Sequence, residues 1–228
     1  MNAGNASTNI PDSEISCLHA LYNSSGGNGW KWSSNEGGNP WQFTANANPC
    51  LDEWQGVTCS SVHVNGYLHI IKLYLDVTNL IGYVPESIAN LTELTELSLS
   101  GNSLSSTIPH SIGTIRNLSY IDLNTNKFDG RIPNSYKQLS NLTYLDLGNN
   151  KLTGPFPAVL CELSTLTQLK LDTNQFTGTI SECLGQITNL QALLLYYNQL
   201  CATIPSYLGN LTQLLILNLG HNHLTGVI

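Results

Sequence analysis

A 24-residue periodicity constrains this chain more than any other feature of its sequence. Leucine or isoleucine recurs every 24 residues from Ile70 to Leu214, and apolar positions three and five residues further on keep the same register. Six successive steps in register indicate an internal repeat, whose units stack because none can bury its apolar side chains alone. The sequence predicts a solenoid of seven units, which are 70–93, 94–117, 118–141, 142–165, 166–189, 190–213 and the partial unit 214–228.

Each unit carries the same local signals, numbered as offsets from its first leucine at offset zero. The L-x-x-L-x-L pattern predicts a short strand, and its copies form a parallel sheet with neighbours about 4.8 Å apart. Asparagine at offset eight can donate and accept, so stacked copies satisfy the buried backbone groups of each turn. Glycine at offset twelve and the following Ile-Pro favour a tight turn and prevent a helix there. The offset-eight asparagines are Asn102, Asn126, Asn150, Asn174, Asn198 and Asn222, with Thr78 the exception.

The unit L-x-x-L-x-L-x-x-N-x-L-x-G-x-I-P resembles the plant-type leucine-rich repeat over residues 70–228. This resemblance implies an α/β solenoid: a right-handed superhelix with a parallel concave β-sheet and a convex side of 3-10 turns and loops. It is shared with the ectodomains of receptor-like proteins and kinases and with polygalacturonase inhibitors.

Residues 1–69 resemble the N-terminal cap of that family, through the helix-like SEISCLHALYNSSGGNGWKW and the motif NPCLDEWQGVTC. The resemblance implies a disulfide between Cys50 and Cys59, and Trp54 packed on the first repeat. The Gly- and Trp-rich insert 26–41 looks more like caps of secreted algal and protist members. A cap is needed because the end of a solenoid exposes its leucines.

Composition excludes two classes of function. Eight Lys and Arg against fifteen Asp and Glu give a net charge of −7, and only 10% of residues are charged. No basic stripe is therefore available for nucleic acid or for an anionic membrane surface. No apolar run is long enough to span a bilayer, and the first residues do not form a signal peptide. Because the last unit stops at offset fourteen without a cap, we expect the chain to be a fragment of a longer protein.

The cysteines favour an extracellular location, because disulfides persist in oxidising compartments. Cys161 and Cys183 lie at offsets nineteen and seventeen of adjacent repeats, within bridging reach on the side away from the sheet. They form either a disulfide or two buried thiols. Cys17 and Cys201 have no evident partner; they are buried thiols or form contacts elsewhere, including bonds to another chain.

Six Asn-x-Ser/Thr sequons are also typical of a secreted glycoprotein. Four lie in the repeats at offsets twenty and twenty-three, where sugar would leave the concave sheet open. The alternative is that the loop consensus supplies N-L-T and N-L-S without modification. The six are Asn5, Asn23, Asn90, Asn117, Asn141 and Asn210.

The concave face is the expected ligand-binding surface, since solenoids bind on that extended surface. At its exposed offsets two, four, six and seven, Tyr120 and Tyr144 share one row, which suits sugar rings or a partner chain. Stacked like charges on Asp122 and Asp146 favour a bound cation or basic group. An apolar patch follows near Ile216; alternatively, Tyr and Leu are there because they suit strands. The predicted binding residues are Tyr74, Asp76, Glu96, Tyr120, Asp122, Tyr144, Asp146, Lys170, Asp172, Leu194, Tyr196, Tyr197 and Ile216.

Catalysis has little support in the sequence. Asp122 and Asp146 would be close enough for a retaining glycosidase, but an open face offers nothing to raise the pKa of either. His221 and His223 flank a ladder asparagine, and no carboxylate follows to complete a metal site. We therefore expect no enzyme activity, no cofactor and no metal.

The sequence thus predicts the N-terminal part of an extracellular, non-catalytic recognition protein that binds a protein, peptide or carbohydrate ligand on its concave face. An alternative is a structural or adhesive component of an extracellular matrix or filament, which would self-associate. Ice binding is the least favoured, because the exposed offset-seven row, from Val77 to His221, is too irregular.

Overall fold

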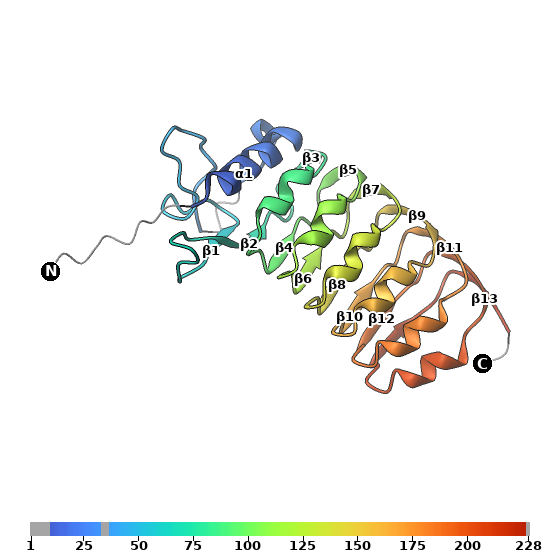
Figure 1. Ribbon diagram of the computed structural model, residues 1–228. Helices are drawn as coiled ribbons and strands as arrows, with labels where there is room; N and C mark the ends of the chain where they lie inside the picture. The colour runs from blue at the N-terminus through green and yellow to red at the C-terminus, as the bar shows by residue number, and fades with distance from the viewer. Residues whose placement is uncertain (1–9, 33–36, 227–228) are drawn as a thin grey trace.

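In the computed structural model, which describes residues 10–32 and 37–226, the repeats stack as successive coils behind a helical cap (Figure 1). One strand from each coil joins an eight-stranded sheet, in the order β1-β2-β4-β6-β8-β10-β12-β14. β1 pairs antiparallel with β2. Every other pair is parallel and joins a strand to the equivalent strand of the next repeat. The strands are β1 (Val57–Cys59), β2 (Ile70–Tyr74), β4 (Glu96–Ser98), β6 (Tyr120–Asp122), β8 (Tyr144–Asp146), β10 (Gln168–Lys170), β12 (Ala192–Leu194) and β14 (Ile216–Asn218). The predicted parallel solenoid is confirmed.

A second, seven-stranded sheet runs along the solenoid in the order β15-β13-β11-β9-β7-β5-β3, and the sequence patterns did not predict it. It uses the residues that follow the ladder asparagine, around offsets nine to thirteen. Its strands are β3 (Ile81–Gly82), β5 (Ser103–Thr107), β7 (Lys127–Gly130), β9 (Lys151–Pro155), β11 (Gln175–Gly178), β13 (Gln199–Thr203) and β15 (His223–Thr225).

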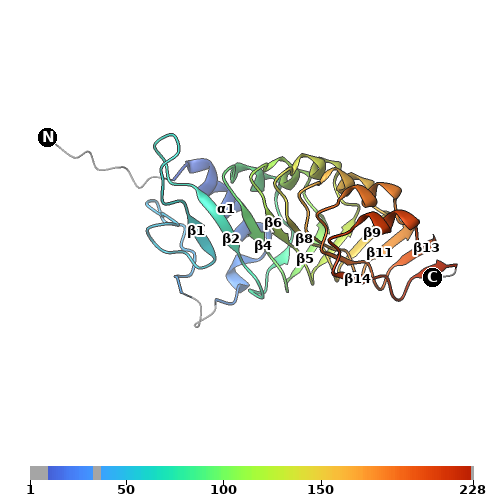
Figure 2. The same ribbon diagram turned by 90° about the horizontal axis from the view of Figure 1, so that it is seen from below.

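Short 3-10 helices close each coil on the side away from the larger sheet (Figure 2). Each begins directly after the proline at offset fifteen, or after Ser181 where the proline is missing. Proline suits this position because its fixed φ is compatible with a helical start and no amide donor is needed there. The helices are η2 (Glu86–Asn90), η3 (His110–Thr114), η4 (Asn134–Gln138), η5 (Ala158–Glu162), η6 (Glu182–Gln186) and η7 (Ser206–Asn210).

The offset-eight asparagines form the predicted ladder. Asn126 Nδ2 donates to the carbonyl of Leu99 in the preceding coil at 2.9 Å, and Asn126 Oδ1 accepts from Leu104 N at 3.0 Å. The same pair of bonds recurs at each ladder asparagine from Asn102 to Asn222. Each amide therefore satisfies backbone groups of two coils, which couples neighbouring repeats.

One continuous apolar core runs from the cap through the repeats. The cap helix α1 (Asp12–Ser24) buries Leu18 and Leu21 completely, and the repeat leucines from Leu73 to Leu190 are equally buried. The short helix η1 (Gly27–Gly29) and the Trp-rich segment complete the cap. Trp54 is 2% exposed, stacks on Trp41 at 5.4 Å and belongs to the same core cluster as the first repeat.

Both predicted disulfides are present. Cys50 bonds to Cys59, and Cys161 bonds to Cys183 between η5 and η6, with 5.6 Å between the Cα atoms of the second pair. The alternative of two buried thiols at Cys161 and Cys183 is therefore wrong. Cys17 is a buried thiol, whereas Cys201 is exposed on β13, which corrects the expectation of burial there. Between residues 10 and 32 and between 37 and 226, no helix is long and apolar enough to cross a membrane.

A buried ionisable pair, which the sequence did not indicate, ties the cap to the first repeat. Glu14 of α1 is 1% exposed; its Oε1 lies 2.5 Å from His69 Nδ1, and its Oε2 accepts from Ile70 N at 2.9 Å. Burial raises the pKa of Glu14, and the bonds from Ile70 N and His69 oppose that rise. The pair fixes α1 against the start of β2.

Candidate ligand-binding surface on the concave sheet

Seven side chains from β2, β4, β6, β8 and β10 form a continuous surface on the larger sheet, which we name the concave strip. Parallel pairing places the offset-two residues in one row and the offset-four residues beside them. Tyr120 thus lies opposite Tyr144, and Asp122 lies opposite Asp146. The strip consists of Tyr74, Glu96, Tyr120, Asp122, Tyr144, Asp146 and Lys170.

The tyrosine rings of the strip cover one another. Tyr120 and Tyr144 stack with centroids 4.3 Å apart and an interplanar angle of 11°. Tyr74 lies 6.3 Å from Tyr120 on one side of this pair, and Lys170 Nζ lies 4.7 Å from the ring centroid of Tyr144 on the other. Tyr74 is tilted by 56° relative to Tyr120, and Lys170 Nζ also donates to the Tyr144 hydroxyl at 2.8 Å. Stacking of a sugar on these rings stays a prediction.

Asp146 is a structural carboxylate. It is only 4% exposed, although offset four was expected to be open. Its Oδ1 accepts from Gly148 N at 3.0 Å and from Asn124 Nδ2 at 3.1 Å. Its Oδ2 accepts from the Tyr144 hydroxyl at 3.2 Å and lies 3.4 Å from Lys170 Nζ. The carboxylate bends back toward the backbone amide two residues on, which removes it from the surface.

Asp122 differs from Asp146, although the two share an offset. Its Oδ1 accepts from Asn124 N at 2.9 Å, and the described residues offer it no ion-pair partner. Burial raises the pKa of Asp122 to about 6; the bond from Asn124 N opposes this, while the charges of Asp146 and Asp76 add to it. The expectation that nothing raises a carboxyl pKa on this face is therefore wrong. Asp122 changes charge near pH 6.

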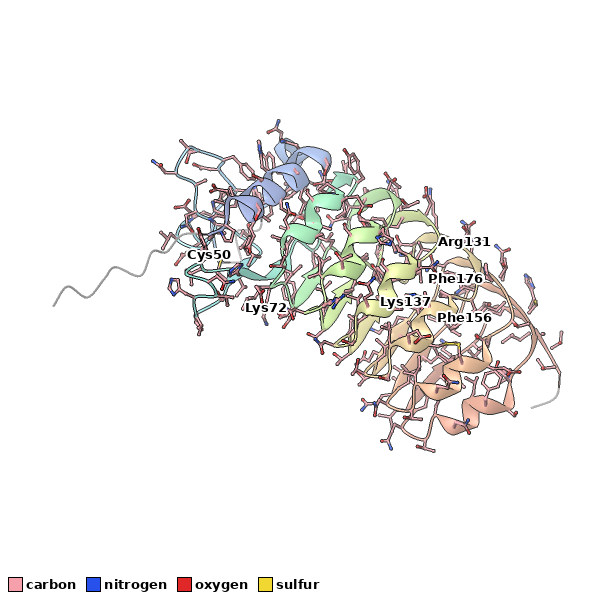
Figure 3. The ribbon with its side chains drawn as sticks, in the orientation of Figure 1. Cys50, Lys72, Arg131, Lys137, Phe156 and Phe176 are labelled. Carbon is pink, nitrogen blue, oxygen red and sulfur yellow. A yellow bond between two sulfur atoms is a disulfide. The ribbon has the colours of Figure 1, made fainter. Side chains whose placement is uncertain are left out.

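At the cap end of the strip, the acidic side chains are bonded to neighbouring side chains and backbone groups. Lys72 Nζ lies 2.8 Å from Glu96 Oε1, and the Tyr74 hydroxyl donates to the same carboxylate (Figure 3 labels Lys72). Asp76 Oδ1 accepts from Ser98 Oγ at 2.6 Å and from Ser100 N at 2.8 Å. These bonds hold the acidic side chains in fixed positions.

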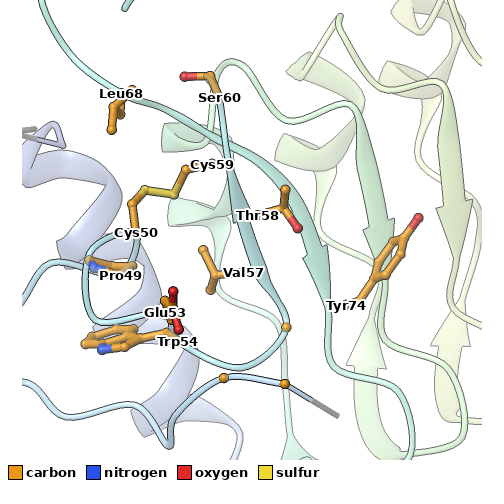
Figure 4. A pocket seen from close by; sticks show the side chains of 13 residues that line it. Pro49, Cys50, Glu53, Trp54, Val57, Thr58, Cys59, Ser60, Leu68 and Tyr74 are labelled. Atoms are coloured by element: carbon orange, nitrogen blue, oxygen red, sulfur yellow. A yellow bond between two sulfur atoms is a disulfide. The ribbon is translucent and has the colours of Figure 1, made fainter. Parts of the chain in front are cut away.

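A hollow of about 620 Å³ adjoins this end of the strip. Figure 4 shows it between the Cys50–Cys59 disulfide and Tyr74, with Val57 and Thr58 of β1 along its wall. An extended ligand that crosses the strip toward the cap has room to end here.

The four residues of the predicted apolar patch differ in exposure. Leu194 is half-buried, whereas Ile216 and Tyr197 are exposed at 55% and 52%. Tyr196 hydrogen-bonds Asp172, which is only 6% exposed despite its predicted exposure. Burial raises the pKa of Asp172, and the bond from Tyr196 opposes that rise. Tyr197 stacks on His221 at 4.0 Å. These side chains do not form one apolar surface with the strip.

The described sequon asparagines all lie away from the concave strip and are exposed. Asn5 lies outside the described residues. Two of the others also hold neighbouring coils, because Asn117 Nδ2 donates to Thr92 O and Asn141 Nδ2 to Arg116 O, both at 3.1 Å. The exposed sequons are Asn23, Asn90, Asn117, Asn141 and Asn210.

Known families and solved structures match this architecture. Models of the leucine rich repeat match residues 93–115, 117–139, 132–176 and 189–211. The leucine-rich-repeat ectodomain of the receptor kinase SOBIR1 from Arabidopsis thaliana is 30% identical, with a TM-score of 0.70 over 84% of this chain and 97% of that one. The chain belongs to the leucine-rich-repeat family.

Two further structures widen this leucine-rich-repeat comparison. The plant peptide hormone receptor RGFR1, solved in complex with RGF2, is 36% identical over 67% of this chain, with a TM-score of 0.66. This chain spans 24% of that receptor. A plant ice-binding protein is 25% identical, with a TM-score of 0.77 over 96% of this chain and 66% of its own. No curated protein sequence matches significantly.

Proposed function

We propose that this chain is an extracellular, non-catalytic recognition module that binds a peptide or protein segment along the concave strip. Asp122 carries the proposal. It is a half-buried carboxylate that forms no ion pair among the described residues, although the charge of Lys170 acts on it, and the Tyr120 hydroxyl donates to its Oδ2 at 3.4 Å. A basic side chain of the ligand would bring a positive charge and donate hydrogen bonds to the Asp122 carboxylate and the tyrosine hydroxyl oxygens, which are held at fixed positions.

The geometry favours a peptide over a carbohydrate. The Asp122 carboxylate beside the stacked tyrosines suits a ligand with a positive charge, which a neutral sugar lacks. The strip offers the hydroxyls of Tyr120 and Tyr144 beside the Asp122 carboxylate, which suits an extended chain with a basic residue. RGFR1, a structure of the same family, is named as a peptide hormone receptor, which supports this ligand class.

The two disulfides support an extracellular location, because such bonds are rare in reducing compartments. The exposed sequons lie where glycans would leave the strip free. The related ectodomain of SOBIR1 belongs to a receptor kinase.

Selection from a random peptide display library at pH 7 tests the proposal. We expect wild-type protein to enrich peptides that contain Lys or Arg, and the dissociation constant of these peptides to rise about tenfold or more in Asp122→Asn, a loss of about 1.4 kcal/mol. The double variant Tyr120→Ala/Tyr144→Ala should also lose binding. Asp129→Asn is the matched control, because Asp129 is exposed on β7 of the other sheet. Peptides without basic residues, or equal binding by Asp122→Asn, would refute the proposal.

Ice binding is a second candidate, because the plant ice-binding protein shares the fold over 96% of this chain. The offset-seven row cannot serve, since it combines Val77, Gly101, Tyr197 and His221 in left-handed backbone positions. If the chain binds ice, another row of the solenoid must do so.

A further inference from the structure

Two parallel rows of small, mostly uncharged polar side chains run along the edge of the larger sheet where its strands begin, and we name them the flank array. They occupy offset one and offset twenty-three, outside the concave strip. The offset-one row is Thr95, Ser119, Thr143, Thr167 and Gln191, and the offset-twenty-three row is Asn117, Asn141, Thr165, Asn189 and Gln213.

The same side-chain hydrogen bond recurs at the first four residues of the first row, from Thr95 to Thr167. Thr143 Oγ1 donates to Ser119 O at 3.0 Å, and Thr167 Oγ1 donates to Thr143 O at 2.8 Å. Thr95 and Ser119 make the equivalent bonds at 2.9 and 3.1 Å. A β-branched side chain held by such a bond has one conformation, and its oxygen keeps a lone pair free for water.

The second row is held in a similar way. Thr165 Oγ1 donates to Ser140 O at 3.0 Å, and Asn189 Nδ2 donates to Ser164 O at 2.9 Å. Neighbouring repeats are spaced by the sheet at about 4.8 Å. The two rows lie two residues apart along the chain, with the offset-twenty-three residues in the turn before each strand. The array is therefore a grid of polar groups that repeats once per coil.

The half of the grid in residues 143–213 is the more uniform. A shallow open groove there is lined only by Thr, Asn and Gln side chains, including the exposed Thr188 and Thr212. It has no charged lining residue, so it offers little to an ionic ligand. Rigid, uncharged groups at a regular spacing instead suit a surface that is itself a lattice of water.

We propose that the flank array in residues 143–213 is an ice-binding surface. This inference rests on the second candidate function, ice binding, and assigns it a face distinct from the concave strip. Regular hydroxyl and amide groups hold first-shell water in ordered positions, and such water can merge with the surface of an ice crystal. Charged side chains would orient water differently, and none lines the groove.

The sequons bear on which half of the grid is available. Asn117 and Asn141 belong to the offset-twenty-three row, and glycans on them would cover the half nearer the cap. Thr165 and Asn189, which continue that row, are not sequons. The sequon at Asn210 ends at the groove residue Thr212, so a glycan there would border the surface, and its hysteresis is best measured on unglycosylated protein.

Thermal hysteresis and ice-crystal shaping of the full chain test this assignment. The double variant Thr188→Lys/Gln213→Lys places two charges on the groove, keeps the Asn210 sequon, and changes no side chain that makes the hydrogen bonds described for the two rows. Thr179→Lys is the matched control, because Thr179 is exposed and lies in the loop after β11.

We expect wild type and Thr179→Lys to shape ice crystals and show hysteresis, and the double variant to lose most of it while its unfolding transition is unchanged. No hysteresis in wild type would overturn ice binding itself. Hysteresis that persists in the double variant would overturn the assignment to the flank array and leave ice binding standing. Neither result bears on the proposal that a peptide binds at Asp122.

Discussion

Replacing Asp122 with asparagine should stabilise the fold at neutral pH, because the protein holds this carboxylate in a position that disfavours its charge. Burial and the neighbouring charges of Asp146 and Asp76 raise its pKa from 3.8 to about 6. A carboxyl group with a raised pKa binds its proton more tightly in the folded state. Ionisation of Asp122 therefore costs stability, and the cost develops as the pH rises from about 4 through about 6.

The size of the effect follows from the pKa difference. About two pH units correspond to roughly 3 kcal/mol at full effect, since one unit is 1.36 kcal/mol. Asp122 is half-buried, so solvent screening reduces this to about 1–2 kcal/mol. The asparagine Oδ1 can still accept from Asn124 N. We expect Asp122→Asn to raise the free energy of unfolding by about 1–2 kcal/mol at pH 7.5 and by nothing at pH 4.

Urea denaturation at pH 7.5 and pH 4 measures this difference. Asp146→Asn is the control at the same offset, and it should destabilise at pH 7.5 because it removes the ion pair with Lys170. If Asp122→Asn destabilises the protein equally at both pH values, Asp122 is a structural carboxylate like Asp146. That result would refute the proposal that Asp122 binds a basic group of the ligand.

Three further predictions concern the solenoid itself. Asn150→Ala removes a ladder amide and should lower the free energy of unfolding by about 2–3 kcal/mol; a loss below 0.5 kcal/mol in urea denaturation would contradict its role between coils. Cys161→Ser/Cys183→Ser should lower the free energy of unfolding by about 2–4 kcal/mol. Because this variant lacks the Cys161–Cys183 bond, a reducing agent should destabilise it less than it destabilises wild type. Tyr136→Phe should raise the melting temperature, because the fully buried Tyr136 hydroxyl has no hydrogen-bond partner among the residues that the structure describes; an unchanged or lower melting temperature would contradict this.

Periodicity predicted the parts of the fold that each repeat determines alone. In-register leucines predict which side chains face the core, and Asn126 at its fixed offset predicts the bonds between coils. The spacing of Cys161 and Cys183 likewise predicts a disulfide once adjacent coils stack. Family resemblance added the Cys50–Cys59 bond.

The second sheet and the cap contacts could not be predicted in this way. Strands β3 to β15 follow the asparagine turn without a leucine pattern of their own, and their pairing depends on how neighbouring coils settle. Glu14 and His69 are 55 residues apart, and no repeat relates them.

The candidate site shows the same limit. Offset predicts which side of the sheet a side chain leaves, but not its rotamer or its neighbours across coils. Asp122 and Asp146 share an offset, yet Lys170 pairs with only one of them. A signal was present, because a carboxylate can accept from the amide two residues on, as both do here. That bond reduces exposure in a way that periodicity does not reveal.

The pH dependence of peptide binding tests the central claim most directly. A selected peptide that contains Arg but no His, Asp or Glu should bind wild type about tenfold more weakly at pH 5 than at pH 7, because a carboxyl with a pKa of about 6 is mostly protonated at the lower pH. Asp122→Asn should bind weakly and equally at both. Wild-type affinity that is unchanged or tighter at pH 5 would contradict the assignment of Asp122 as the site for a basic ligand group.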